Sequence, residues 1–130
     1  LQGGAEMIEA AKSAAGNTKI LGVSLLTSLD ETDTSELYGN SFDDQFTKLI
    51  TLAQSSSVDG IVCSPKELIS LQDLNKIKVV PGIRNTQTND DQKRTMTSQE
   101  AYVQGADYIV VGRPITQANN IEAAIEEYLV

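Results

Sequence analysis

The sequence lacks histidine, has a single cysteine, and contains no apolar run of the roughly 18 residues that a membrane-spanning helix requires. Without histidine the usual zinc ligand sets cannot be assembled, and Cys63 alone cannot form an internal disulfide framework. We therefore expect a protein of the reducing cytoplasm, with no metal site and no membrane partner.

The amino-terminal residues also lack the features of a natural start. Leu1 to Gly4 carry neither the basic nor the apolar region of a signal peptide, and the sequence does not begin with methionine. This pattern favours a segment that begins inside a longer protein, in a loop before a helix; a trimmed tag or a processed terminus is the alternative. The 130 residues suffice for one modest domain, whereas a complete eight-stranded barrel needs roughly 200 residues or more.

Positive charge is scarce in this chain. Ten lysine and arginine residues stand against 18 aspartate and glutamate residues, which gives a formal net charge of -8 at pH 7. No block of basic residues forms a compensating stripe, so the chain repels the phosphates of nucleic acids and of anionic lipids. We expect no nucleic-acid partner.

Short apolar runs alternate with segments that have apolar residues at helical spacing. The runs predict four buried strands, at residues 19–26, 58–63, 78–81 and 107–111, and the spacing predicts five helices, at residues 5–15, 41–56, 65–71, 97–105 and 121–129. The acidic residues 30–36 and the polar residues 85–93 are predicted to be loops. Buried strands separated by helices indicate an α/β fold with a parallel sheet, built from right-handed βαβ units, and residues 1–130 show no linker that would divide them.

The residues that follow each strand deserve the closest inspection, since parallel α/β folds bind ligands beyond the carboxyl ends of their strands. Two of the three arginines, Arg84 and Arg113, occupy such positions, which points to an anionic ligand. Gly112 would let a phosphate approach the backbone beside Arg113. Thr27 and Ser28 end the first strand, where their hydroxyls could bind a ligand ring.

Each of these candidates also has a plain structural interpretation. Arg113 could pair with a surface carboxylate, Arg84 and Gln92 could be solvated, and the Thr27 hydroxyl could cap local backbone. Cys63 has no histidine to act as its base, and we expect it to be buried packing. A magnesium site in the acidic residues 30–36 is conceivable, although a solvated face is the simpler interpretation.

Six motifs occur in order along the chain: GGAEMIEAA at the start, ILGVSLLTSL, VDGIVCSPKE, PGIR at 81–84, DQKRTMTSQEA at 91–101 and GADYIVVGRPIT at 105–116. Taken together, they resemble the orotidine 5'-phosphate decarboxylase family of the bacterial type. The resemblance covers the whole chain and implies a (β/α)8 TIM barrel, of which this segment would supply the C-terminal half, strands five to eight. It implies decarboxylation of orotidine 5'-monophosphate to uridine 5'-monophosphate and CO2, in de novo pyrimidine biosynthesis, without a cofactor.

The same resemblance assigns substrate binding to five positions: Thr27, Arg84, Gln92, Gly112 and Arg113. It places no catalytic residue in this segment, because the family's Asp-x-Lys-x-x-Asp motif is absent; the nearest string, starting at Asp91, ends in Met96. The isolated segment is therefore expected to be inactive, and the family resemblance implies a homodimer. Two alternatives remain: a magnesium-dependent sugar-phosphate lyase of the same barrel superfamily, and a non-catalytic phosphate-binding half-barrel.

Overall fold

The computed structural model describes residues 1–85 and 95–129, which contain one parallel sheet of four strands. The sheet order follows the chain, β1-β2-β3-β4, and every neighbouring pair is parallel. The strands are β1 (Leu21–Val23), β2 (Gly60–Val62), β3 (Ile77–Val80) and β4 (Tyr108–Ile109). The predicted four-stranded parallel sheet is confirmed, although β1, β2 and β4 are shorter than their apolar runs and β3 begins one residue earlier than predicted.

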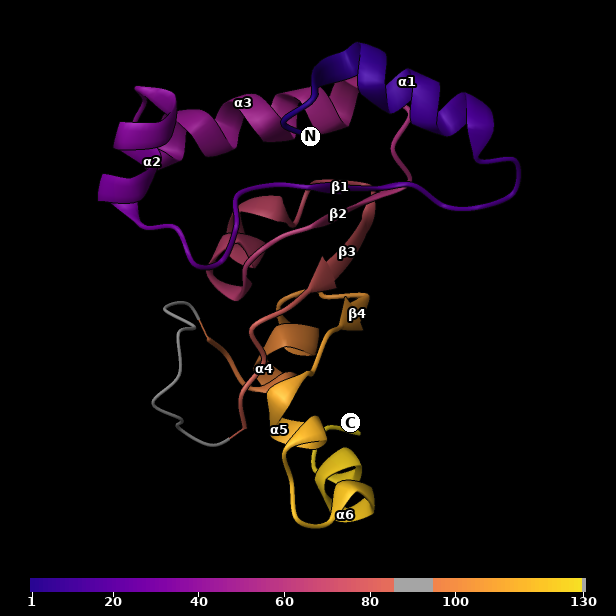
Figure 1. The fold of residues 1–130 in the computed structure, drawn as a ribbon, viewed down its shortest axis with the longest axis vertical. Coiled ribbons are helices and arrows are strands. Elements are labelled where there is room, and N and C mark those ends of the chain that lie inside the picture. The colour runs from indigo at the N-terminus through magenta and orange to yellow at the C-terminus, as the bar shows by residue number, and fades with distance from the viewer. Residues whose placement is uncertain (86–94, 130) are drawn as a thin grey trace.

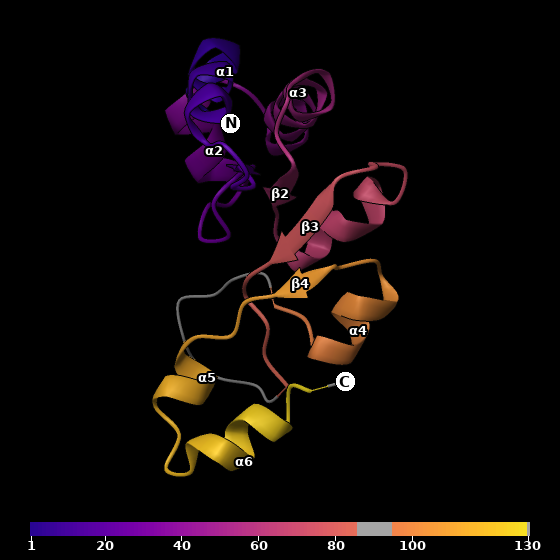
Figure 2. The ribbon, with the colours of Figure 1, turned by 90° about the vertical axis from the view of Figure 1, so that its right-hand side faces the viewer.

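Helices fill every connection between the strands, as parallel pairing requires. They are α1 (Gly4–Ala14), α2 (Glu31–Tyr38), α3 (Phe42–Ser55), the 3₁₀ helix η1 (Pro65–Leu71), α4 (Ser98–Val103), α5 (Arg113–Thr116) and α6 (Ile121–Glu126). The first three lie together near β1 and β2, and α4, α5 and α6 lie at the opposite end near β4 (Figures 1 and 2).

The prediction that residues 30–36 form a loop was wrong, because α2 begins there. The Asp30 side chain accepts the backbone N–H of Asp33, while the Asp33 side chain accepts the N–H of Asp30 at 3.0 Å. This reciprocal cap stabilises a helix start by satisfying amides that have no partner within the helix. Gly39 ends the helix with a φ of 68°, a left-handed conformation that glycine adopts without steric cost.

The expected number of five helices was also too low, since the described residues contain seven. Besides α2, the short helix α5 was missed; it is closed by hydrogen bonds from Ile115 N and Thr116 N to Gly112 O at 2.9 and 3.0 Å. The predicted last helix, at residues 121–129, is longer than the observed one. Helix α6 ends at Glu126, and in this range only Ala124 and Tyr128 are buried.

The two faces of the sheet differ sharply in burial. On one face Ile61, Cys63 and Val80 are at most 1% exposed and lie in the core beneath the helices. On the other face the exposed fraction is 41% for Val23 and 60% for Tyr108, which are aligned through β2 and β3. Parallel sheets are normally covered on both faces, so the second face, which we call the open face, has the apolar character of a surface meant to be covered.

Two aspartates fasten the amino ends of the strands. The Asp59 carboxyl, before β2, accepts the N–H of Ile20 at 2.7 Å and the Lys12 ammonium at 2.6 Å. The hydrogen bond from Lys12 is the main cause that holds the pKa of Asp59 below its ordinary value. Asp107, before β4, likewise accepts the N–H of Lys78 at 2.7 Å. This end of the sheet is occupied by structural contacts, which leaves the carboxyl end for a ligand.

Candidate functional site

The expected substrate-binding residues emerge at the carboxyl edge of the sheet. Arg84 follows β3, Gly112 and Arg113 follow β4, and Thr27 follows β1. Because β3 and β4 are adjacent, the two arginine positions leave neighbouring strands, whereas Thr27 leaves a strand two places from β3. Gln92 lies outside the described residues.

Arg84 is held against the protein and is only 9% exposed. Its guanidinium donates from Nη1 to the Ile83 carbonyl oxygen at 2.8 Å, and its backbone N–H donates to Met96 O at 2.9 Å. Ile83 and Met96 also form an isolated parallel bridge. Since an unpaired buried charge is costly, these contacts argue against Arg84 being a freely solvated rim charge.

Gly112 and Arg113 lie at the start of α5 and are both exposed. A methyl group placed on Gly112 would meet no described atom within 4 Å, so packing against the described residues does not require a glycine there. Open space beside the backbone is what a ligand that approaches the main chain needs. The Arg113 guanidinium is a planar donor suited to an anion.

Thr27 stands on a short, anchored segment after β1. The backbone N–H of Ser24 donates to Val62 O at 3.0 Å, and that of Leu29 donates to Leu26 O at 3.0 Å. Between them Leu25 is 2% exposed, while Thr27 itself is half-buried. The Thr27 side chain is therefore carried by a turn that its own backbone hydrogen bond closes, just after the last bond that ties β1 to β2.

Glu67 is a buried polar residue that the sequence interpretation missed. It is 5% exposed, and its Oε2 accepts the N–H of Ser64 at 2.8 Å and the hydroxyl of Ser24 at 3.2 Å. One carboxyl group thereby ties the carboxyl ends of β1 and β2 together. The signal was present in the sequence: Glu67 follows Ser64 by three residues, the same spacing that Thr97 and Glu100 have in the cap of α4.

Cys63 is a packing residue, as predicted. It is 1% exposed, and burial, with a smaller contribution from the Glu67 charge, raises the pKa of its thiol to about 12. At neutral pH such a thiol is not the thiolate that nucleophilic catalysis needs.

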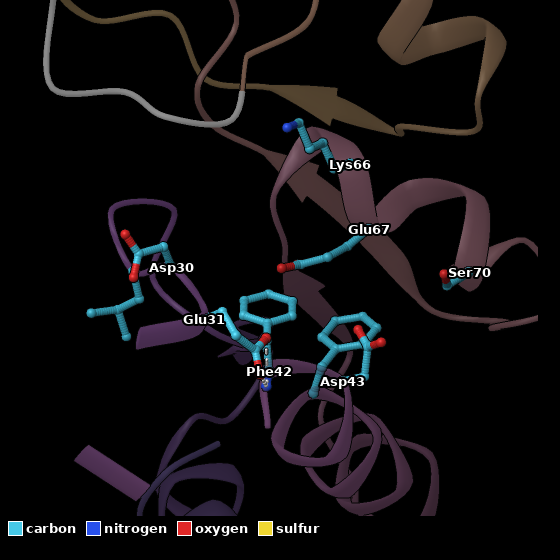
Figure 3. A pocket seen from close by; sticks show the side chains of 9 residues that line it. Asp30, Glu31, Phe42, Asp43, Lys66, Glu67 and Ser70 are labelled. Carbon is cyan, nitrogen blue, oxygen red and sulfur yellow. Dashed lines mark hydrogen bonds between the residues drawn. The ribbon is translucent and has the colours of Figure 1, made fainter. Parts of the chain in front are cut away.

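A cavity of about 440 Å³ opens on the helix side of the sheet, between α3 and η1 (Figure 3). The rings of Phe42 and Phe46 stack with centroids 6.3 Å apart, and both carboxyl oxygens of Glu31 accept the N–H of Phe42. The remaining lining residues are Leu29, Asp30, Asp43, Lys66, Glu67 and Ser70. Four carboxylates face a single ammonium here, so this cavity disfavours a phosphate, and its lining includes none of the expected binding residues.

Two other kinds of site, a metal site and a membrane span, can be compared with the side chains and helices of residues 1–85 and 95–129. In that part of the chain no three histidine, cysteine, aspartate or glutamate side chains are grouped so as to hold a metal ion. None of its helices combines the length and the apolar character needed to span a membrane. Of the acidic residues near position 30, Asp30 and Asp33 cap α2, and Glu31 accepts the N–H of Phe42.

The chain is similar to known proteins over nearly its whole length. A sequence profile described as "Orotidine 5'-phosphate decarboxylase / HUMPS family" matches residues 1–128. An orotidine 5'-phosphate decarboxylase of Neisseria meningitidis serogroup C is 43% identical over 135 residues, which cover 96% of this chain and 55% of that protein. One of Erythrobacter litoralis is 42% identical, with 96% and 58% covered.

A solved structure has the same fold. The crystal structure of orotidine 5'-phosphate decarboxylase from Lactobacillus acidophilus matches with a TM-score of 0.77 and 31% identity, over 99% of this chain and 61% of that one. The chain spans about half the length of the curated relatives it matches. Its four-stranded parallel sheet fits half of a TIM barrel, which confirms the predicted fold class. The chain belongs to the orotidine 5'-phosphate decarboxylase / HUMPS family.

Proposed function

We propose that this chain supplies the phosphate- and base-binding part of an enzyme that converts orotidine 5'-monophosphate to uridine 5'-monophosphate and CO2. The observation that carries the proposal is the 43% identity to a decarboxylase over 96% of the chain, combined with Arg84 and Arg113 at the ends of adjacent strands. In an acidic chain, two arginines at one sheet edge provide a local site for a nucleotide phosphate.

Each of the five expected residues has a role in this proposal. Arg113 and the backbone at Gly112 hold the 5'-phosphate, and the Gln92 amide is a further contact to the ligand. Arg84 contacts the substrate from the neighbouring strand. Thr27 binds the pyrimidine side from the end of β1. Binding of the phosphate supplies energy that positions the base. The departure of CO2 from that base leaves a carbanion at C6.

The chemical step needs a group that this sequence lacks. A carbanion at C6 is stabilised and then protonated by a nearby ammonium, which the family takes from its Asp-x-Lys-x-x-Asp motif. That motif is absent from these residues. We therefore expect the chain to bind uridine 5'-monophosphate but not to decarboxylate orotidine 5'-monophosphate by itself, and we propose that the active form is a cytoplasmic homodimer that includes the motif.

The second candidate is a sugar-phosphate lyase, which the shared family description leaves open. Both functions need a phosphate grip, but only the decarboxylase needs a pyrimidine site. Titration calorimetry with uridine 5'-monophosphate and with ribulose 5-phosphate separates the two. Tighter binding of the nucleotide supports the decarboxylase, and a preference for the sugar phosphate contradicts it.

Replacement of Arg113 tests the assigned role directly. Arg113→Ala is expected to lower the affinity for uridine 5'-monophosphate about tenfold to a hundredfold, because a charged hydrogen bond to the phosphate is lost. The affinity for uridine, which has no phosphate, should be nearly unchanged. Lys48→Ala, which removes an exposed cation on α3, is the matched control for net charge. Equal weakening of nucleotide and nucleoside would refute a phosphate role for Arg113.

A further inference from the structure

Asn85, the residue after Arg84, is held by three hydrogen bonds from distant segments. Its Oδ1 accepts the N–H of Ser98 at 2.9 Å, its Nδ2 donates to Glu127 O at 2.5 Å, and its backbone N–H donates to the Tyr128 hydroxyl at 3.2 Å. We call these four residues, Asn85, Ser98, Glu127 and Tyr128, the Asn85 clasp. It joins the end of β3 to the start of α4 and to the residues that follow α6.

The Asn85 side chain makes two hydrogen bonds, and both are to main-chain groups. An asparagine amide offers both a donor and an acceptor, and here each is used on a different main-chain segment. Tyr128 is 7% exposed, so packing of the residue holds its hydroxyl in place. Asn85 is half-buried between these contacts.

The neighbour of this fixed residue is Arg84, whose guanidinium donates to the Ile83 carbonyl oxygen. Its backbone is held on one side by the Met96 carbonyl and on the other by the clasp. An arginine whose backbone is fixed before binding loses less entropy when it engages a ligand, which strengthens binding without a new contact. The clasp therefore acts one residue away from a proposed binding group.

We propose that Asn85 is a positioning residue for Arg84, and that Tyr128, near the end of the described chain, serves ligand binding through it. This inference rests on the proposed function, in which Arg84 contacts a phosphate-bearing nucleotide. It assigns a binding role to Tyr128, which is 43 residues from Asn85 in the sequence. The competing interpretation is that the clasp only fastens the end of the chain.

Two variants separate positioning from fastening. Tyr128→Phe removes the hydroxyl and keeps the packed ring, and Asn85→Ala removes both side-chain hydrogen bonds. Tyr102→Phe on α4 and Asn17→Ala after α1 are matched controls away from the clasp. The readouts are the affinity for uridine 5'-monophosphate, the urea midpoint of unfolding, and the NMR signal of the Arg84 Nε–Hε group.

Under the proposal, both clasp variants shift or broaden the Arg84 signal and lower the affinity for uridine 5'-monophosphate about fivefold. The two control variants change neither the signal nor the affinity. A lower urea midpoint with an unchanged Arg84 signal and unchanged affinity would overturn it. Should the unaltered chain bind no uridine 5'-monophosphate, the proposed function fails. The Arg84 signal still decides the clasp in that case: a change in Asn85→Ala supports positioning, and no change in either variant refutes it.

Discussion

Glu67 connects the ends of two strands through one buried carboxyl group, and its replacement tests how firmly the carboxyl edge of the sheet is held. In Glu67→Ala the N–H of the fully buried Ser64 loses its acceptor, and the Ser24 hydroxyl, 1% exposed, loses its partner. An unsatisfied buried donor costs about 1 to 3 kcal/mol and an ordinary hydrogen bond contributes about 1 kcal/mol. We expect the free energy of unfolding to fall by about 2 to 4 kcal/mol.

The assay is urea unfolding followed by circular dichroism, with two comparison variants. Glu67→Gln keeps one acceptor oxygen for the Ser64 N–H and should lose only about 1 kcal/mol. Glu36→Ala removes an exposed carboxylate of α2 and should change stability by less than about 0.5 kcal/mol. If Glu67→Ala were as stable as Glu36→Ala, the carboxyl group would not be what ties β1 to β2.

Two further predictions concern the strand β2 and its surroundings. Because burial raises the Cys63 pKa to about 12 from an ordinary 9.0, the thiol stays protonated in the folded state while it ionises in the unfolded state. This contribution to stability is complete below pH 9 and is lost as the pH rises toward 12; a Cys63→Ala variant with the same alkaline loss of stability would contradict it. A methyl group on Gly60 would lie 2.5 Å from the Ile77 carbonyl oxygen, which is backbone, whereas one on Gly22 would lie 2.5 Å from the tip of the Leu1 side chain, which can rotate away more easily. Gly60→Ala should therefore cost about 1 to 3 kcal/mol in urea unfolding, clearly more than Gly22→Ala, and equal costs would refute the close approach of β2 and β3.

Sequence periodicity predicted the sheet because each strand is an apolar run bounded by polar residues or glycine. The same reasoning failed at α2, whose residues are mostly acidic and exposed, since that helix depends on the reciprocal cap of Asp30 and Asp33. It failed again at α5, where only four residues turn after Gly112. Both helices depend on local hydrogen bonds, and such bonds leave no hydrophobic periodicity in the sequence.

The expected site residues could be placed at strand ends from the sequence, but the contacts that hold them could not. The buried Arg84 donates from its guanidinium to the Ile83 carbonyl oxygen, and Asn85 contacts residues that are 13 and 43 positions away. A polar stretch after a strand predicts only a loop, because polarity alone does not say which distant segment an amide will contact. The cap by Glu67 is different, since its spacing from Ser64 was visible and could have been used.

The proposed site residues differ in what holds them. Arg84 is anchored within this chain by the Asn85 clasp and by the hydrogen bond from its own N–H to Met96 O. Thr27 and Arg113 instead follow β1 and β4, whose Val23 and Tyr108 are 41% and 60% exposed on the open face. An apolar face that is normally covered in a parallel sheet leaves the strands beside it less constrained when it is open. Arg84 should therefore be the best-ordered of the three positions in this chain, while Thr27 and Arg113 need the open face to be covered before they contribute fully to ligand affinity.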